Sequence, residues 1–155
     1  MKLRKYRAED CAELAELFFH TVHAVNAKDY SERQLDAWAT GNVDIAQWNR
    51  SFLAHTTLVA ETGDGIVGFG DMDDQGYLDR LYVHRYHQHS GIASALVKEL
   101  ERLALARGVS DFSTYASITA RPFFEKCGYR VIRENTVLRA GVALTNYQME
   151  KGPVK

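Results

Sequence analysis

Residues 77–107 read YLDRLYVHRYHQHSGIASALVKELERLALAR, and this stretch decides the fold of the chain. Its opening residues, 77–83, form an apolar-rich run that predicts a buried strand. After Gly91, apolar residues recur at the spacing of one helix face: Ile92, Leu96, Leu100 and Leu103. Gly108 stands where a helix C-cap is expected. The stretch therefore predicts a strand, a short polar loop and a long amphipathic helix.

The loop from Gln88 to Ala93 predicts an anion-binding site. A strand that enters a helix through a loop with no bulky residue at Gly91 directs several free N–H groups at one point, where the helix dipole adds positive potential. A mononucleotide P-loop needs a Gly-Lys-Ser/Thr ending and a dinucleotide fingerprint needs three ordered glycines, and the loop has neither. The alternative is an ordinary strand–loop–helix connection that binds nothing.

Two motifs resemble those of the GCN5-related N-acetyltransferases. Gln88, Gly91 and Ala93 fit the family pattern Gln/Arg-x-x-Gly-x-Gly/Ala, after a Leu-Tyr-Val strand. Residues 117–129 resemble the family segment Asn-x-x-Ala-x-x-Phe-Tyr-x-x-x-Gly-Phe, in which Ser117 stands for the usual Asn and Phe124 for the usual Tyr. With Trp38 near the N-terminus and Thr145-Asn146 near the C-terminus, the whole chain looks like the YafP-like bacterial branch of this family.

The bulk composition excludes several classes of protein. The chain has 155 residues, which suits one domain, 1–155, with 46% hydrophobic and 25% charged residues. A net charge of −1 gives no reason to expect nucleic-acid binding or a basic membrane patch, and no apolar run is long enough to span a membrane. Two cysteines are too few for a disulfide framework, and no Cys/His spacing predicts a metal site. We expect a soluble cytoplasmic protein, and a homodimer is left open.

The order of elements predicts a single-domain α/β (α+β) fold whose mixed sheet is flanked by helices. Strands are expected at 2–7, 56–62, 65–71, 77–83, 112–116, 129–137 and 142–149. Two capping pairs, Asp10 with Glu13 and Ser31 with Gln34, open the first two helices. Further helices are expected around Ile45 and Trp48, after Gly91, and over 120–127. The resemblance implies that the two central strands splay apart and that the cofactor enters the gap.

The resemblance also implies acetyl-CoA as cofactor and assigns the residues that bind it. The backbone of Leu81, Tyr82 and Val83 pairs with the pantetheine arm, and the Val83 N–H donates to the thioester carbonyl, where it would stabilise an oxyanion. Residues expected at the pyrophosphate are Gln88, His89, Ser90, Gly91, Ile92, Ala93 and Ser94, and beside the arm Ser117, Phe123 and Phe124. Basic residues that could balance phosphate charge are His84, Arg85, His87 and His89.

The sequence lacks the residue that many relatives use as general acid, because Phe124 replaces the tyrosine that protonates the leaving thiolate in them. Tyr115 is the first substitute, followed by Ser117 or a water molecule, and Tyr115 could equally be a core or rim tyrosine. General acid help contributes about 10²–10⁴-fold in rate, so its loss does not abolish transfer.

Asp79 is the leading candidate for the base that takes the proton of the amine. An acid in an apolar strand needs a partner or a function, and the alternative is an ion pair with Arg80 or an outward, solvated position. Asp71 and Asp73 are weaker candidates, since acids near a strand end are more often turn residues.

Polar and aromatic residues of the first helices are expected on the acceptor side: His20, His23, Tyr30 and Trp38. Trp38 could instead be core, and Cys127 is expected to be a packed apolar residue rather than a nucleophile. The predicted function is acetyl-CoA-dependent N-acetyl transfer to a primary amine, of a small molecule or peptide, by direct attack in a ternary complex. The alternative is a CoA-binding sensor or partner module without activity. A nucleotide-phosphate enzyme is disfavoured because no Walker lysine is present.

Overall fold

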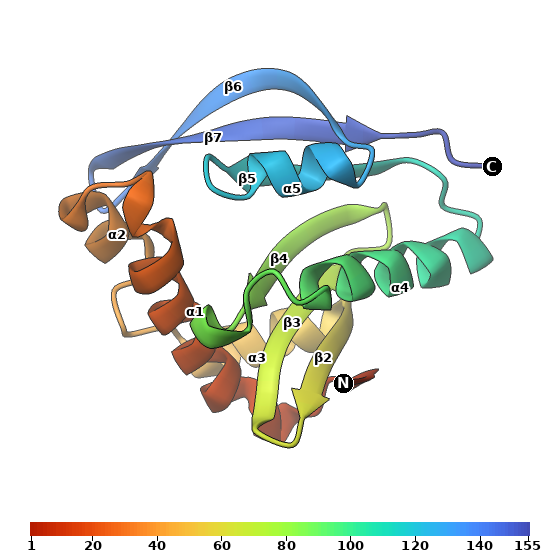
Figure 1. The fold of residues 1–155 in the computed structure, drawn as a ribbon, viewed down its shortest axis with the longest axis horizontal. Helices are drawn as coiled ribbons and strands as arrows, with labels where there is room; N and C mark the ends of the chain where they lie inside the picture. The colour runs from red at the N-terminus through yellow and green to blue at the C-terminus, as the bar shows by residue number, and fades with distance from the viewer.

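The computed structural model describes residues 1–155 and contains one seven-stranded mixed sheet with helices on both faces (Figure 1). The strand order is β1-β2-β3-β4-β5-β7-β6, and every neighbouring pair is antiparallel except β4 with β5. The strands are β1 (Lys2–Lys5), β2 (Thr56–Thr62), β3 (Gly65–Met72), β4 (Tyr77–Val83), β5 (Phe112–Ser117), β6 (Arg130–Arg139) and β7 (Val142–Lys151). The predicted α/β class and mixed sheet are confirmed.

Two groups of helices cover the two faces of the sheet. The first contains α1 (Cys11–Val25), α2 (Glu32–Trp38) and α3 (Ile45–Ala54), and the second contains α4 (Ile92–Ala106) and α5 (Arg121–Lys126). Short 3-10 turns occupy Ala8–Asp10, Asn26–Lys28 and Arg85–His87. None of these helices is both long enough and apolar enough to cross a lipid bilayer.

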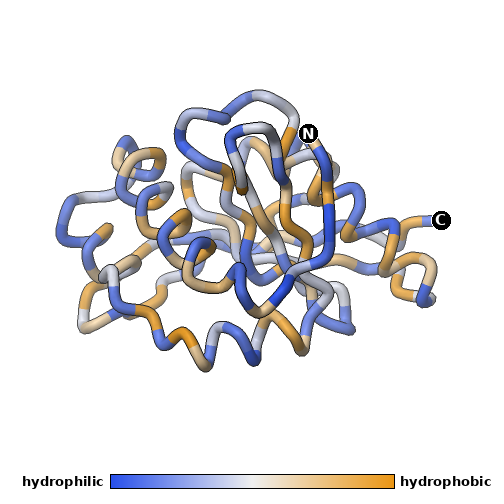
Figure 2. The backbone as a smooth tube through the Cα atoms, turned by 90° about the horizontal axis from the view of Figure 1, so that it is seen from below, coloured by the Kyte–Doolittle hydropathy of each residue, from blue (hydrophilic) through white to orange (hydrophobic).

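Each helix layer has its own hydrophobic core. Leu96 and Leu100 of α4 pack with Met72 and Leu78 on one face, whereas Phe18 of α1 packs with Trp48 of α3 and Tyr82 of β4 on the other. In Figure 2 the helical parts of the tube alternate between hydrophilic and hydrophobic colours along their length, because only one side of each helix meets the sheet.

The pairing of β4 with β5 is short, and this creates the central gap. The two parallel strands pair only at Tyr77 with Ser113 and at Leu78 with Thr114, where the Thr114 hydroxyl also donates to the Leu78 carbonyl at 2.9 Å. Beyond these positions the strands diverge, as Figure 1 shows between β4 and β5. The predicted splay is confirmed.

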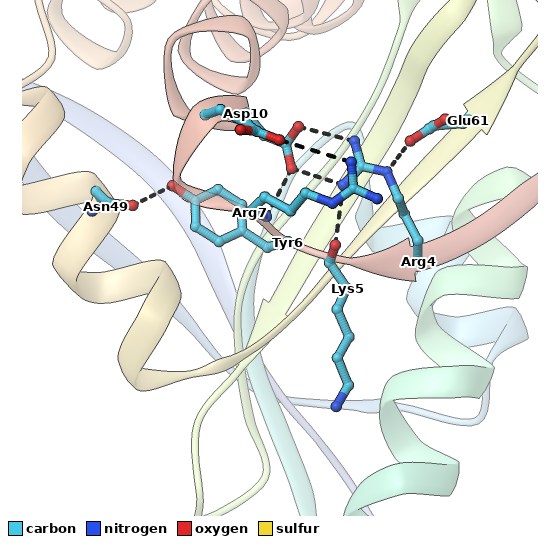
Figure 3. A network of polar contacts seen from close by, with 8 residues as sticks. Arg4, Lys5, Tyr6, Arg7, Asp10, Asn49 and Glu61 are labelled. Carbon is cyan, nitrogen blue, oxygen red and sulfur yellow. Dashed lines mark hydrogen bonds and ion pairs between the residues drawn. The ribbon is translucent and has the colours of Figure 1, made fainter.

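The start of α1 differs from the predicted capping box. Asp10 makes no side-chain cap to α1; its carboxylate instead binds both terminal nitrogens of Arg4, at 2.8 and 2.9 Å, and accepts the Arg7 N–H at 2.8 Å (Figure 3). Arg4 also contacts Glu61 of β2. The carboxylate is thus engaged by the Arg4 guanidinium and by the Arg7 N–H, both upstream of α1, so the Asp10–Glu13 box was wrong although the helix was right.

Other local predictions are confirmed. Ser31 and Gln34 form the reciprocal capping box of α2, with bonds of 3.2 and 2.9 Å. Gly108, at a φ of +90°, follows the last turn of α4 as expected for a C-cap glycine. The hairpin between β6 and β7 turns at Ala140 and Gly141.

Candidate active site

The loop between β4 and α4 leaves several backbone N–H groups free at one point. Gly91 adopts a φ of +84°, and a Cβ built on it would meet no heavy atom within 4 Å. The first N–H used inside α4 is that of Ala95, which bonds the Gly91 carbonyl at 3.0 Å. The N–H groups of Ile92, Ala93 and Ser94 therefore have no partner within the helix, and with the helix dipole they fit an anion.

Side chains of the loop hold its shape. The Gln88 amide donates to the Val83 carbonyl at 2.6 Å, and the Ser90 hydroxyl donates to the His87 carbonyl at 2.5 Å. His89 has a φ of +59°, a conformation that is uncommon for residues other than glycine. Gln88 and Ser90 thus shape the loop from within, while the open space beside Gly91 leaves room for a pyrophosphate.

The basic residues of the loop are not all equivalent. His84 has a lowered pKa, chiefly because of burial and then because His87 and Arg85 are close, so it favours the neutral form. His87 lies 3.6 Å from Asp64, on the side of the loop that faces α1 and the β2–β3 turn. His84 and His87 line a hollow of about 480 Å³ there together with His20.

The backbone of β4 presents a free N–H at the gap. His84 donates its N–H to the Val67 carbonyl at 2.7 Å, and residue pairs of an antiparallel ladder alternate between bonded and non-bonded. The next pair, Val83 with Gly68, is therefore non-bonded, and the Val83 N–H points away from β3 toward β5. This direction is what the predicted role of Val83 as a donor to a thioester carbonyl requires.

A pocket of about 150 Å³ lies across the gap between β4 and β5. Aromatic side chains dominate its lining: Tyr30, Trp38, Tyr77, Tyr82 and Tyr115. Asp79 is its one carboxylate and Arg139 its one guanidinium; the remaining lining residues are Ser117, Val137, Leu144, Thr145 and Asn146.

Of the four residues predicted on the acceptor side, the structure brings two into this pocket. Tyr30 and Trp38 stack edge-on at 5.4 Å, and the Tyr30 hydroxyl is already engaged, donating to Thr145 at 2.6 Å and accepting from Ile118 at 2.9 Å. His20 and His23 lie elsewhere. His20 lines the hollow beside His84, and the His23 ring contacts the Ala39 carbonyl at 2.8 Å. Helical periodicity could not tell which side of α1 faces the pocket.

The residues predicted around the leaving group do not all line the pocket. Tyr115 lines the pocket, is 41% exposed and has no hydrogen-bond partner for its hydroxyl within the protein. Ser117 lines the same pocket, and its hydroxyl accepts the Ala120 N–H at 3.0 Å at the start of α5. Phe124 is only 3% exposed and packs with Phe123 and Tyr129 in the core beneath α5, outside the pocket lining.

Asp79 lies at a β-bulge that turns its side chain into the pocket. Asp71 pairs with Arg80 and Met72 with Leu78, so Asp79 is the extra residue of β4, and bulges re-aim side chains in this way. Its side chain is 34% exposed, 3.6 Å from the Arg80 guanidinium. Burial raises the pKa of Asp79, and the neighbouring Asp71 carboxylate raises it further, against the opposing charges of Arg80 and His55.

The sequence reasoning missed the polar residues behind Asp79. Asp71 was expected to be a turn acid, but it is fully buried in β3 and bonds both His55, at 2.8 Å, and Arg80, at 2.6 Å. Asp73 is the turn acid, accepting the N–H groups of Gln75 and Tyr77. The adjacency of Asp79 and Arg80 was the one available signal, and it pointed to the weaker of the two ion pairs of Arg80.

Comparisons with known proteins agree with this geometry. The family model described as acetyltransferase (GNAT) domain matches residues 26–151. A curated relative, the uncharacterized N-acetyltransferase YafP of Escherichia coli (strain K12), is 31% identical over 99% of this chain and 97% of its own. A solved structure of a GCN5-related N-acetyltransferase from Rhodopseudomonas palustris is 36% identical, with a TM-score of 0.93 over 97% of this chain and 94% of that one.

A more distant structure shares the fold. The crystal structure of the PaiA N-acetyltransferase of Thermoplasma acidophilum, in complex with coenzyme A, is 20% identical and superposes with a TM-score of 0.81 over 97% of each chain. The family match over most of the sequence and the full-length relative show that the chain is an acyltransferase that belongs to the GNAT acetyltransferase family.

Proposed function

We propose that this enzyme transfers the acetyl group of acetyl-CoA directly to the nitrogen of a small primary amine. The observation that supports the proposal is the pocket across the gap, because its lining includes the Asp79 carboxylate of β4, the strand that also carries the free Val83 N–H. The neighbouring loop supplies the free N–H groups of Ile92, Ala93 and Ser94 for the pyrophosphate. Complexes of distant relatives with coenzyme A or acetyl-CoA support the choice of donor.

The transfer is a direct displacement at the thioester carbon. The neutral amine attacks, the C–N bond forms, and the carbonyl oxygen gains negative charge that the Val83 N–H stabilises. Asp79 takes one proton from the nitrogen, directly or through water, and the C–S bond then breaks. The departing thiolate takes its proton from the Tyr115 hydroxyl or from a water molecule, because Phe124 has no proton to give.

The pocket favours a small, weakly charged acceptor. Its volume of about 150 Å³ and its single carboxylate suit one ammonium group among aromatic rings, which stabilise cations over their faces. A polyamine or aminoglycoside would bring several positive charges to a lining that contains only Asp79 as an anion and Arg139 as a cation. Arg139 is exposed and has no ion-pair partner, so it can receive a carboxylate carried by the acceptor.

An amine panel tests this function. Purified protein is given acetyl-CoA with amino acids, their amides, simple aromatic and aliphatic amines, a peptide and an aminoglycoside, and thiol release is measured together with the mass of the product. We expect N-acetylation of small amines and a higher KM for carboxylate-bearing acceptors in Arg139→Gln. A protein that binds CoA tightly but acetylates none of them would support the alternative, a binding module without activity.

We propose in addition that the enzyme acts in the cytoplasm. Cys11 and Cys127 are free thiols, which fits the reducing cytoplasm, where acetyl-CoA is available. A homodimer stays a prediction, and sedimentation equilibrium of the purified protein tests it.

A further inference from the structure

A buried polar cluster lies directly behind Asp79, outside the pocket lining. Asp71, on β3, has no exposed surface, and its Oδ2 atom receives both His55 Nδ1, at 2.8 Å, and Arg80 Nη1, at 2.6 Å. The same Arg80 nitrogen is 3.6 Å from Asp79 Oδ2. The cluster thus joins β3, β4 and the residue that follows α3 into one charged group.

The charged groups of the cluster lie close together, yet one of its buried oxygen atoms has no hydrogen-bond donor. A ring nitrogen of His55 and one carboxylate oxygen each of Asp71 and Asp79 lie within 4.8 Å of one another. The second oxygen of Asp71, Oδ1, is buried and has no hydrogen-bond partner. A buried acceptor without a donor is costly, and a protonated Asp79 carboxyl is a donor that could supply the missing bond.

We propose that Asp71 and His55 are positioning residues that set the proton affinity of Asp79 in opposite directions. The Asp71 carboxylate strengthens it, because a second negative charge disfavours ionised Asp79 and because Asp71 can accept a bond from the protonated form. The His55 imidazolium weakens it, because a nearby positive charge favours the carboxylate.

The surroundings of the cluster explain why the partners stay in place. The Arg80 guanidinium stacks on the rings of Trp48 and Phe52, at 4.9 and 4.6 Å, and donates to the Ser51 hydroxyl at 3.1 Å. It therefore remains with Asp71 rather than turning to Asp79. The hydrogen bond to Asp71 raises the pKa of His55, which keeps its positive charge toward neutral pH.

Other titratable groups surround Asp79, both in the neighbouring strands and across the pocket. The groups on its own side of the sheet are Asp71, Arg80, His55, Asp73 and Tyr77, and the titratable groups that line the same pocket are Tyr30, Tyr82, Tyr115 and Arg139. Burial and the neighbouring Asp79 raise the pKa of Tyr77 to about 12, so it is neutral throughout the working range. Asp73 is tied to its own turn by two backbone N–H groups. The balance at Asp79 is thus set by the buried cluster.

The inference rests on the proposed role of Asp79 as base, so its test has two independent readouts. The first is the acidic limb of kcat/KM, and the second is the titration of the Asp79 carboxyl by ¹³C NMR, assigned with Asp79→Asn. We expect Asp71→Asn to move the acidic limb and the midpoint of the NMR titration to lower pH. His55→Gln should move the limb and the midpoint to higher pH, and each shift should be roughly one pH unit. His55→Lys retains a positive charge and should restore the wild-type position.

Matched controls separate this coupling from simple damage. Ser51→Ala removes an uncharged bond to the same Arg80 and should leave the limb where it is. If Asp71→Asn does not fold, His55→Gln and His55→Lys still decide the matter, since His55 is at the edge of the cluster. Unmoved Asp79 titration in His55→Gln, or shifts of both variants in one direction, would overturn the inference. A shifted NMR titration with no acetyl transfer would refute the proposed function and leave the coupling intact.

Discussion

The side-chain amide of Gln88 donates a hydrogen bond of 2.6 Å to the carbonyl oxygen of Val83. This bond ties the loop that carries the free N–H groups to the end of the strand that carries the candidate oxyanion donor. The proposed sites for the pyrophosphate and for the thioester are therefore held in a fixed relation before any ligand binds. Such preorganisation lowers the cost of ordering the site on binding.

Gly91→Glu should abolish CoA binding while the protein remains folded. A carboxylate beside the free N–H groups would occupy the position expected for the pyrophosphate, and its negative charge would repel the phosphates. Calorimetric titration with CoA measures the loss. Gly91→Asn is the control, because asparagine tolerates the φ of +84° and nothing lies within 4 Å of the added Cβ. Unchanged CoA affinity in folded Gly91→Glu would show that the loop is not the phosphate site.

Tyr115→Phe should lower kcat by about 10²-fold or more with little change in CoA affinity. The reason is that Tyr115 lines the pocket with a hydroxyl that no protein group engages, whereas Phe124 is buried in the core. Steady-state kinetics with calorimetry of CoA binding checks this. A near-normal kcat would assign the proton to water and Tyr115 to the pocket wall.

Asp10→Asn should destabilise the fold at neutral pH by about 1.5–3 kcal/mol, since it removes a charged partner of Arg4. The Arg4 guanidinium, followed by the Arg7 N–H, lowers the pKa of Asp10. The stabilisation is therefore complete above the pKa of Asp10 in the unfolded chain, which is about 4. It is lost as the pH falls through the lower pKa that Asp10 has in the folded protein. Urea unfolding of both proteins from pH 7 to pH 3 should show the difference shrinking in acid. Glu9→Gln, at an exposed ion pair, is the control expected to have little effect.

Gly76→Ala should destabilise the fold strongly, by about 2 kcal/mol or more, without touching a catalytic group. A Cβ there would come within 2.3 Å of the Asp111 carbonyl oxygen, at a φ of +86°. Urea unfolding measures the loss. Gly63→Ala is the matched control, because nothing lies within 4 Å of its Cβ and its φ is not in the left-handed region. Equal stability of the two variants would mean that the turn into β4 can rearrange.

The elements and the free N–H groups at the start of α4 could be predicted because their signals are local. Helical periodicity, capping residues and turn glycines act within a few neighbours, and Ser31 with Gln34 is an example in which sequence and structure agree. The predicted capping role of Asp10 was wrong, because its carboxylate binds Arg4, a residue of another element.

The polar group behind Asp79 depends on contacts that sequence spacing does not contain. Asp71 and Asp73 are two residues apart in the chain, yet one is fully buried by sheet pairing and the other closes a turn. His55 joins the cluster because it directly precedes β2, whose first residue, Thr56, pairs with Met72 of β3. In the same way, the position of His20 and His23 depends on how α1 is rotated over the sheet.

The role of Asp79 is tested most directly by the pH dependence of kcat/KM in wild type and Asp79→Asn, each with two acceptors whose amine pKa values differ. Burial and Asp71 raise the pKa of Asp79, so the active carboxylate is lost at a less acidic pH than for an ordinary aspartate. We predict a rise of wild-type kcat/KM with pH that is the same for both amines, and a loss of about 10²-fold with disappearance of that limb in Asp79→Asn. A limb that follows the pKa of the amine and is unchanged by the mutation would contradict the account.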